Sequence, residues 1–210
     1  MGATVAELIQ AVEAADSKGA MALAVHQLAA TQDAAAIPTL ITVLGYNNPG
    51  AAVAAVEGLA SLGSVAVPAL LEQIDGYNYG ARAWAIRALA LIGDPRALPV
   101  LLETAKGDFA LSVRRAAARG LGTIDWTRLT PDQAAASQAE VLEVLTQATT
   151  DPEWVVRYAA IAALQTLAKG LVKADPTPIL NALQQVFQQD ETPAVQARAR
   201  LALDTLAAPR

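Results

Sequence analysis

The chain of 210 residues predicts an all-α solenoid, a stack of about six helical hairpins. Apolar residues recur at helical spacing, and no stretch alternates for long enough to form a half-buried strand. Hydrophobic residues make up 54% of the chain, but many are alanines in evenly spaced blocks, which favours close packing of helix on helix. A motif also recurs at a nearly fixed interval, which is typical of a repeat array.

The repeat is visible when the segments VHQLAATQDAAAIPTL and IRALALIGDPRALPVL are aligned without gaps. Asp33 then falls on Asp94. Pro38 falls on Pro99, and in VEGLASLGSVAVPALL, with Leu59 in the frame, Pro68 lies one place earlier. One leucine anchors each unit, at Leu28, Leu59, Leu89, Leu121, Leu164 and Leu203. Their separations of 31, 30, 32, 43 and 39 residues indicate a unit of about 30 residues with two later insertions.

Each unit is predicted to contain two helices. The first helix has a proline in its first turn, in the segments PTLITVL, PALLEQI and PVLLETA. Proline costs nothing there, because the N–H group that it lacks has no partner within the helix. The second helix carries small or apolar residues at helical spacing and ends near a glycine, at Gly63, Gly93 or Gly122.

The longest interruption of the repeat runs from Thr123 to Gln138. Inside it, Thr130 is expected to cap a new helix, with Gln133 reaching back to the cap. We therefore predict one repeat domain over residues 1–210, with an insertion around residues 123–138.

The composition excludes several classes of protein. Zero cysteines remove disulfides, thiolate nucleophiles and zinc–thiolate sites. With one histidine, His26, and no familiar ligand spacing, no metal site is expected. A net charge of −5 argues against a nucleic-acid binder. The first residues lack the pattern of a signal peptide and no apolar run reaches membrane-spanning length, so we expect a cytoplasmic protein that does not enter a membrane.

Arginines follow acidic residues at a fixed spacing in the second half of the chain. Arg114 lies six places after Asp108, and Arg157 lies six places after Asp151. Arg82 has the same position in its own repeat, at the flank of the face expected to be core. Interfaces between repeats commonly contain paired charges, so these five residues are predicted to form a structural ladder between adjacent turns.

A second column, which includes Arg87 and Arg119, faces away from the expected core on the helices that would line the inner surface of the array. Beside it in the pattern lie Tyr79, Trp84, Arg115, Trp154 and Tyr158. Core packing does not require these side chains, and aromatic residues clustered with arginine are typical of recognition surfaces. A solvated helix face with scattered aromatics remains the alternative.

Such a surface would suit a planar ligand with acidic arms, or an acidic protein segment. Arginine pairs with carboxylates through its fork of N–H groups, and aromatic rings provide flat stacking surfaces. No glycine-rich phosphate loop, Ser/His/Asp set or pair of carboxylates stands out in the sequence. The residues by themselves therefore predict a binding module.

The repeat resembles a known family. DPEWVVRYAAIAAL resembles the HEAT-like repeat, and about six copies cover almost the whole chain. More specifically, GYNNPGAAVAAVEGLASLG, DGYNYGARAWAIRALALIGDPRALPVL and SVRRAAARGLG resemble the smaller, F-type subunit of the heterodimeric phycocyanobilin lyases of cyanobacteria.

The resemblance implies a lyase subunit that works with an E-type partner. Such lyases attach phycocyanobilin reversibly, through a thioether, to a cysteine of the phycocyanin α subunit. Phycocyanobilin would be a substrate, and no cofactor is implied. The reactive thiol belongs to the acceptor, which fits a chain without cysteine. Related isomerising lyases carry a Cys/His motif that is missing here, so attachment without isomerisation is expected.

The resemblance also gives the surface residues a role. The side chains expected to contact the bilin are Tyr79, Trp84, Arg87, Arg115, Arg119, Trp154 and Tyr158. The arginines would pair with the two propionates, and the aromatic rings would hold the conjugated system. Glu57 or Asp75 would lie near the pyrrole nitrogens and favour the protonated, more electrophilic chromophore.

Two other functions remain open at this point. One is a HEAT-like adaptor that acts in phycobilisome assembly or degradation without making bonds. The other is a general scaffold, natural or designed, because alanine-rich repeats are readily engineered. The two uneven repeat spacings, 43 and 39 residues, argue against a designed array.

Overall fold

The computed structural model describes residues 2–75, 78–171 and 175–208, except for the side chains of Asp75 and Tyr79. Within these ranges the chain forms α-helices and short 3₁₀ helices, and no strand. The all-α prediction is therefore confirmed for the described chain. The helices gather into two compact units, Met1–Ile92 and Gly93–Arg210, here called the N-unit and the C-unit. The expectation of a single domain stays a prediction, and each unit is described by itself.

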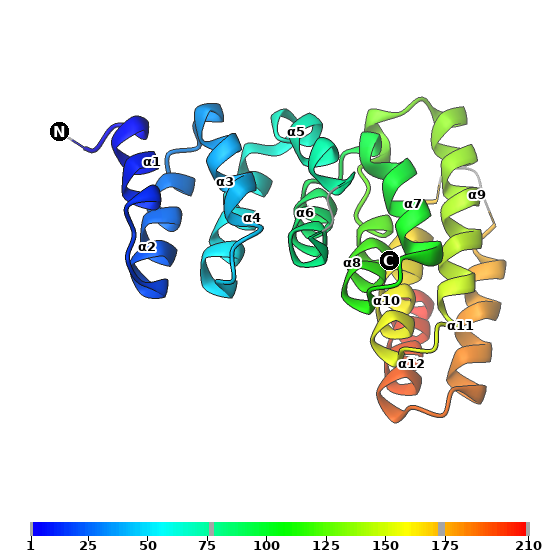
Figure 1. Cartoon of the computed structure of the whole chain (residues 1–210). Coiled ribbons are helices and arrows are strands. Elements are labelled where there is room, and N and C mark those ends of the chain that lie inside the picture. Colours follow the sequence, from blue (N-terminus) through cyan, green and yellow to red (C-terminus); the bar gives the residue numbers. More distant parts are fainter. Residues whose placement is uncertain (1, 76–77, 172–174, 209–210) are drawn as a thin grey trace. The chain divides into compact units, whose positions relative to one another are not determined.

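The N-unit contains three helical hairpins (Figure 1). Their helices are α1 (Val5–Glu13), α2 (Lys18–Ala29), α3 (Ile37–Val43), α4 (Pro49–Leu62), α5 (Val67–Glu72) and α6 (Tyr79–Ile92). The second helices pack in the order α2, α4, α6, and α3 also contacts α5. First and second helices thus form separate layers, which is the arrangement expected of a solenoid.

The C-unit repeats this arrangement with longer helices (Figure 1). Its helices are α7 (Leu98–Gly107), α8 (Leu111–Leu121), α9 (Pro131–Ala148), α10 (Trp154–Gly170), α11 (Thr177–Gln189) and α12 (Pro193–Ala207). Among the second helices, α10 packs between α8 and α12, and among the first helices α9 contacts both α7 and α11. No described helix in either unit is long and apolar enough to cross a membrane.

Short 3₁₀ helices connect several of these elements: η1 (Ala34–Ala36), η2 (Gly63–Val65), η3 (Gln73–Asp75), η4 (Pro95–Ala97) and η5 (Trp126–Arg128). Asp33, Asp94 and Asp125 cap η1, η4 and η5, because each carboxylate accepts a hydrogen bond from the N–H two residues later, at 2.8, 3.0 and 3.1 Å. The prolines then lie in the first turns of α3, α5 and α7, which confirms the predicted helix starts.

Glycines end second helices for two different reasons. Gly63 and Gly93 have φ values of 68° and 67°, in the left-handed region that favours glycine. Gly122 has a right-handed φ of −81°, but a Cβ there would lie 2.6 Å from the Cα of Ala163 on α10. At Gly58 a Cβ would lie 2.6 Å from the Cβ of an alanine on α2. The missing side chains therefore allow close approach between neighbouring second helices.

The anchoring leucines form the centre of the core in most of the repeats. Five of them are fully buried: Leu28, Leu59, Leu89, Leu121 and Leu164. Leu203 is only partly buried, because α12 packs against α10 and α11 but has no second helix on its other side among the described residues. The last anchor thus differs from the others through its position at the edge of the stack.

The segment 123–138, predicted as an insertion, forms η5 and the first turns of α9. Thr130 Oγ1 accepts from the Gln133 N–H at 3.4 Å, and Gln133 Oε1 accepts from the Thr130 N–H at 3.1 Å. This reciprocal pair confirms the predicted helix start. Arg128 reaches back from η5 to the buried carboxylate of Asp94 at 2.7 Å, so the inserted turn is joined to the start of its own unit.

The substitution Gly122→Ala should destabilise the protein by about 1–3 kcal/mol, because an added methyl group would overlap the α10 backbone. The free energy of unfolding, measured in urea, tests this expectation. Gly107→Ala is the control, because no atom lies within 4 Å of its added methyl group. That variant should change the free energy of unfolding by less than about 0.5 kcal/mol. Equal losses in both would contradict the close approach of α8 and α10.

Candidate functional site

Two arginines of the C-unit pair with carboxylates of the following hairpin. Arg114 on α8 donates from Nε and Nη2 to the Asp151 carboxylate at 2.7 and 3.1 Å. Its Nη1 donates to the backbone carbonyls of Asp108 and Phe109 at 2.7 and 3.2 Å. One guanidinium thus joins the α7–α8 turn to the α9–α10 turn.

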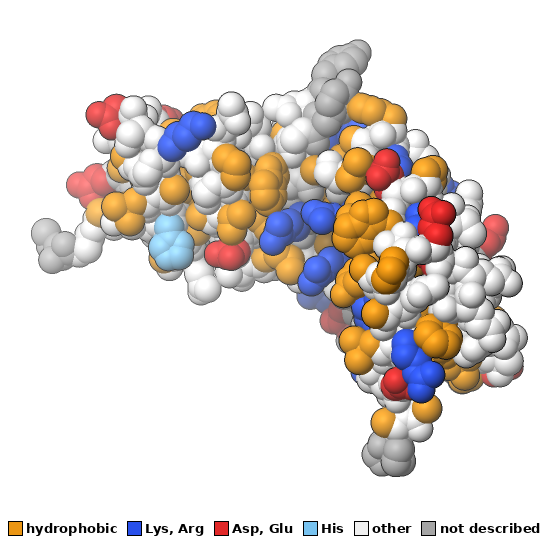
Figure 2. All heavy atoms as spheres, turned by 90° about the horizontal axis from the view of Figure 1, so that it is seen from below, with side chains coloured by type: hydrophobic (Ala, Val, Ile, Leu, Met, Phe, Trp, Pro, Cys, Tyr) orange, Lys and Arg blue, Asp and Glu red, His pale blue; other side chains and the backbone are white. Residues whose placement is uncertain are grey.

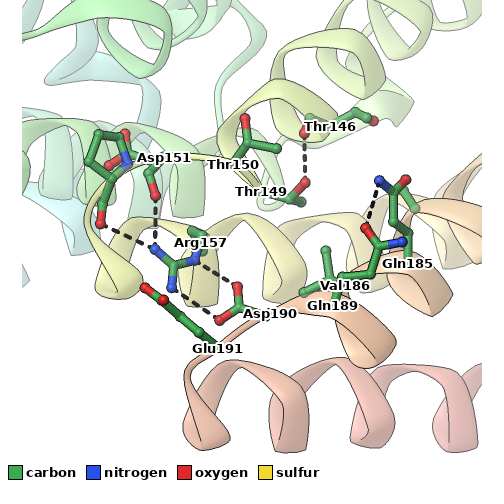
Figure 3. A pocket seen from close by; sticks show the side chains of 12 residues that line it. Thr146, Thr149, Thr150, Asp151, Arg157, Gln185, Val186, Gln189, Asp190 and Glu191 are labelled. Atoms are coloured by element: carbon green, nitrogen blue, oxygen red, sulfur yellow. Dashed lines mark hydrogen bonds and ion pairs between the residues drawn. The ribbon is translucent and has the colours of Figure 1, made fainter.

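Arg157 on α10 repeats these contacts one hairpin later (Figure 3). It donates to the Asp190 carboxylate at 2.7 and 3.0 Å and to the Asp151 carbonyl at 2.9 Å. A further bond, from Nη2, goes to Thr192 Oγ1 at 3.0 Å. Arg157 is only 8% exposed, and a buried guanidinium is tolerated when its charge is paired and its N–H groups are bonded.

In this ladder the backbone carbonyl and the side-chain carboxylate of an aspartate bind different arginines. The aspartate six places before an arginine contributes its backbone carbonyl, while the carboxylate comes from the next repeat. In the last repeat Gln196 replaces arginine and donates to the Asp190 carbonyl at 2.6 Å. Arg82 is partly buried at the equivalent place on α6, and the side chain of Asp75 lies outside the described residues, so the ladder role of Arg82 stays a prediction.

The pKa values of the two acceptor carboxylates reflect this pairing. Burial alone would raise the pKa of Asp151, but hydrogen bonds from Arg114 and the Glu153 N–H, with the arginine charges, hold it below its usual value. Asp190 behaves alike: burial raises its pKa, and the bonds and charge of Arg157 outweigh that effect. Both carboxylates are therefore ionised at neutral pH.

A groove of about 450 Å³ opens beside the Arg157 pair (Figure 3). Its walls include three threonines near the end of α9 and the amides of Gln185 and Gln189 on α11. The guanidinium of Arg157 and the carboxylate of Asp190 are already bonded to each other. Beside this pair, the groove presents hydroxyl and amide groups together with the apolar side chains of Pro152, Ala182 and Val186. The paired charges of Arg157 and Asp190 join neighbouring hairpins.

In the N-unit, two of the predicted recognition residues lie together. The Arg87 guanidinium carbon lies 5.5 Å from the centre of the Trp84 ring, within the range of a cation–π contact. Arg87 is exposed and Trp84 is partly exposed on α6, while Glu57 is exposed on α4. The side chains of Tyr79 and Asp75, also predicted to be part of the site, lie outside what the structure describes.

In the C-unit, the other predicted residues occupy two neighbouring second helices. Arg115 and Arg119 are exposed on α8. Trp154 and Tyr158 are 46% and 41% exposed on the adjacent α10, four residues apart and therefore on one face of the helix. Core packing does not explain these aromatic side chains. Figure 2 shows the side on which the single histidine is exposed, where hydrophobic and basic side chains are neighbours.

One arginine beside Tyr158 was not predicted from the sequence. The Arg198 guanidinium carbon on α12 lies 5.9 Å from the centre of the Tyr158 ring. Ala116 and Ala159 occupy the same repeat position on α8 and α10. An arginine on α12 at the position where α8 and α10 have alanine was the signal that could have identified it. Within the described chain, no group of three or more potential metal-ligating side chains gathers.

Comparison with known proteins places the chain in a family. The model of the HEAT repeats matches residues 67–165 and 112–204. A relative from Synechocystis sp. (strain PCC 6803), named phycocyanin alpha phycocyanobilin lyase CpcF, is 51% identical over 199 residues, which cover 95% of this chain and 92% of the relative. A Nostoc sp. (strain PCC 7120) protein named phycocyanobilin lyase subunit beta is 51% identical over 197 residues, 93% of this chain and 97% of that one.

This chain belongs to the phycocyanobilin lyase beta-subunit family. The solved complex of CpcE and CpcF of phycocyanin lyase from Nostoc sp. PCC7120 contains a chain with 51% sequence identity to it. The two superimpose with a TM-score of 0.76 over 81% of this chain and 99% of that chain. The predicted HEAT-like solenoid and the resemblance to F-type lyase subunits are therefore confirmed.

The Arg157–Asp190 pair should make the stability of this lyase subunit depend on acid. Asp190 has a lowered pKa in the folded chain, so its contribution is complete above the unfolded-state pKa of about 3.9 and is lost as the pH falls further. Asp190→Asn should cost about 3 kcal/mol at pH 7 and weaken the acid dependence below about pH 4. Urea unfolding across pH 7 to 3 measures both effects.

Asp204→Asn is the matched control for this pair. Asp204 also accepts from an arginine, Arg200, at 2.9 Å, but both side chains are more than half exposed. An exposed pair contributes at most about 1 kcal/mol. If Asp204→Asn cost as much as Asp190→Asn, burial of the ladder would not be the source of its stability.

Proposed function

We propose that this chain is the F-type subunit of a heterodimeric bilin lyase, which attaches phycocyanobilin to the α subunit of phycocyanin together with an E-type partner. The observation that carries the proposal is 51% identity, along more than nine-tenths of both chains, to proteins named as phycocyanobilin lyases. The likeness to a chain of the CpcE–CpcF complex supports the E-type partner. A cytoplasmic location is part of the same proposal.

The reaction needs a positioned substrate more than a nucleophile from this chain. The S–H group of the acceptor cysteine adds across a carbon–carbon double bond of the tetrapyrrole, so a C–S bond forms and the thiol proton is transferred to the bilin. This chain has no cysteine, in keeping with a thiol supplied by the acceptor. Holding the bilin and the thiol in one geometry supplies much of the rate enhancement in such additions. Phycocyanobilin is then a substrate, and no resident cofactor is needed.

Exposed side chains on second helices of each unit are the proposed contacts of the tetrapyrrole. Arg87 with Trp84 on α6, and the aromatic pair Trp154 and Tyr158 on α10, offer cationic and flat apolar groups without a role in the core. Arg115 and Arg119 add two exposed guanidinium groups on α8. Arginine forks match the acidic arms of a bilin, and aromatic faces match its conjugated system.

A carboxylate near the pyrrole nitrogens would complete the proposed site. A protonated tetrapyrrole is the better electrophile, and a nearby negative charge favours its protonated form. Glu57 is exposed on α4, and Asp75 is the second candidate. Attachment without isomerisation follows from the missing cysteine of the isomerising motif.

Reconstitution tests the proposed function directly. This chain, an E-type partner, the apo α subunit of phycocyanin and phycocyanobilin should together give a chromoprotein that keeps its bilin under denaturing conditions. Omission of either chain should abolish this adduct. Bilin binding and heterodimer formation without any adduct would instead indicate a non-enzymatic adaptor.

Substitution of two arginines on α6 separates the surface from the ladder. Arg87→Ala should change the free energy of unfolding by less than about 0.5 kcal/mol, because Arg87 is exposed, yet it should slow bilin transfer. Arg82→Ala should cost about 1–3 kcal/mol, because Arg82 is partly buried. Thermal melting and adduct formation measure the two effects. Equal losses of melting temperature would contradict the division of these residues between surface and ladder.

A further inference from the structure

Arg198 on α12 differs from the other arginines of the C-unit helices α10 and α12. Arg157 and Arg200 each form an ion pair, with Asp190 and Asp204 respectively. Arg198 forms no ion pair with any carboxylate in the described chain; its one hydrogen bond is from Nη2 to Gln165 Oε1 at 2.6 Å.

The guanidinium of Arg198 is partly buried without enough hydrogen bonds or charge partners to offset its loss of contact with water. Its Nη1 is inaccessible to solvent and has no hydrogen-bond partner. Burial lowers the pKa of Arg198, and the only group that opposes this effect is Tyr158. A buried N–H group without a partner and a cation without a counter-ion both reduce stability. Such a group is retained in proteins where it has a function, and binding of an anion is the simplest function for an unpaired cation.

The position of Arg198 indicates which anion could reach it. The guanidinium lies over the Tyr158 ring, and Tyr158 shares one exposed face of α10 with Trp154. Arg198 itself keeps part of its surface exposed, so rotation about its outer bonds would bring Nη1 to the surface beside these rings. An acid that arrives there meets a cation and two aromatic faces.

We propose that Arg198 is a carboxylate-binding residue of the lyase, held against Tyr158 by Gln165 in the free chain and turned outward to pair with a propionate of the bound tetrapyrrole. This inference rests on the proposed function and adds a binding residue on α12 to the site. A bilin satisfies both parts of the local surface, because it joins acidic arms to a flat conjugated system. Arg198 is a binding residue here and takes no part in the addition itself.

The first test is a comparison of stability with function. Arg198→Met removes the charge but keeps an apolar stem over Tyr158, so the free chain should melt at the same temperature or higher. Formation of the adduct by the heterodimer should nevertheless slow. Arg157→Met is the contrasting variant, because it breaks a buried ion pair and should lower the melting temperature. A clear loss of melting temperature in Arg198→Met would show a structural arginine and overturn the proposal.

The second test uses the substrate to identify the carboxylate. The full heterodimer is titrated with phycocyanobilin and with its dimethyl ester, in which both propionates are neutral. The ratio of the two dissociation constants, ester over acid, should fall about tenfold in Arg198→Met. Arg198→Lys should keep part of the preference, because it keeps the charge but loses the fork. Arg200→Met, on the same helix with an exposed pair, should leave the ratio unchanged.

The outcomes separate this inference from the proposed function. An unchanged ratio in Arg198→Met, with normal bilin binding and transfer by the wild-type heterodimer, overturns the role of Arg198 alone. Weaker heterodimer formation with an unchanged ratio also overturns it, because the carboxylate would then belong to the partner chain. If the wild-type heterodimer does not bind the bilin, the proposed function is contradicted, and the role of Arg198 is contradicted with it.

Discussion

The close approach of neighbouring second helices is the constraint on which the rest of this structure depends. A single hairpin cannot bury its apolar face, so each second helix must pack against the next one. Small residues allow that approach, and Gly58 and Gly122 stand where even a methyl group would overlap the neighbouring helix. Once one face of each helix is used in this way, the remaining face is free to carry side chains that the core does not need.

The wholly or partly buried arginines described in the C-unit are of two kinds, paired and unpaired. Arg114 and Arg157 are paired in both charge and hydrogen bonds, so they stabilise the turns between hairpins and are not available to a ligand. Arg198 has a buried N–H group without a partner and no counter-ion among the described residues. The first arrangement is that of a structural residue, and the second is one that a binding surface would explain.

The placement of aromatic side chains is consistent with catalysis by positioning. Trp84 lies on α6 of the N-unit, and Trp154 and Tyr158 lie on α10 of the C-unit. Each of these helices packs against neighbouring helices of its own unit, so these side chains are not on loops. In the proposed site, helices packed within each unit would limit the orientations of a bound tetrapyrrole and favour one reacting geometry. In the proposed reaction the thiol comes from the acceptor protein, so the proposed role of these helices is to hold the bilin and leave its reactive carbon accessible.

The sequence by itself determined the features that depend on neighbours along the chain. Prolines and capping aspartates set the helix starts, Thr130 and Gln133 form the capping box, and the leucine period indicates the number of hairpins. These follow from spacing, because helix caps and helical faces are local. The family was recognisable from the residues of the repeats themselves. The period also predicted that Arg87 in the N-unit, and Arg119 and Tyr158 in the C-unit, would be exposed, as they are.

Only the tertiary structure decided the contacts between repeats. The carboxylate partner of Arg114 is Asp151, which is 37 residues away in the chain, and Arg198 reaches Gln165 across 33 residues. Gly122 was expected to end a helix by its backbone freedom, but its right-handed φ and the contact with α10 show that the missing side chain matters instead. The spacing placed the ladder charges between adjacent turns, but which side chains from distant hairpins meet depends on how the hairpins pack.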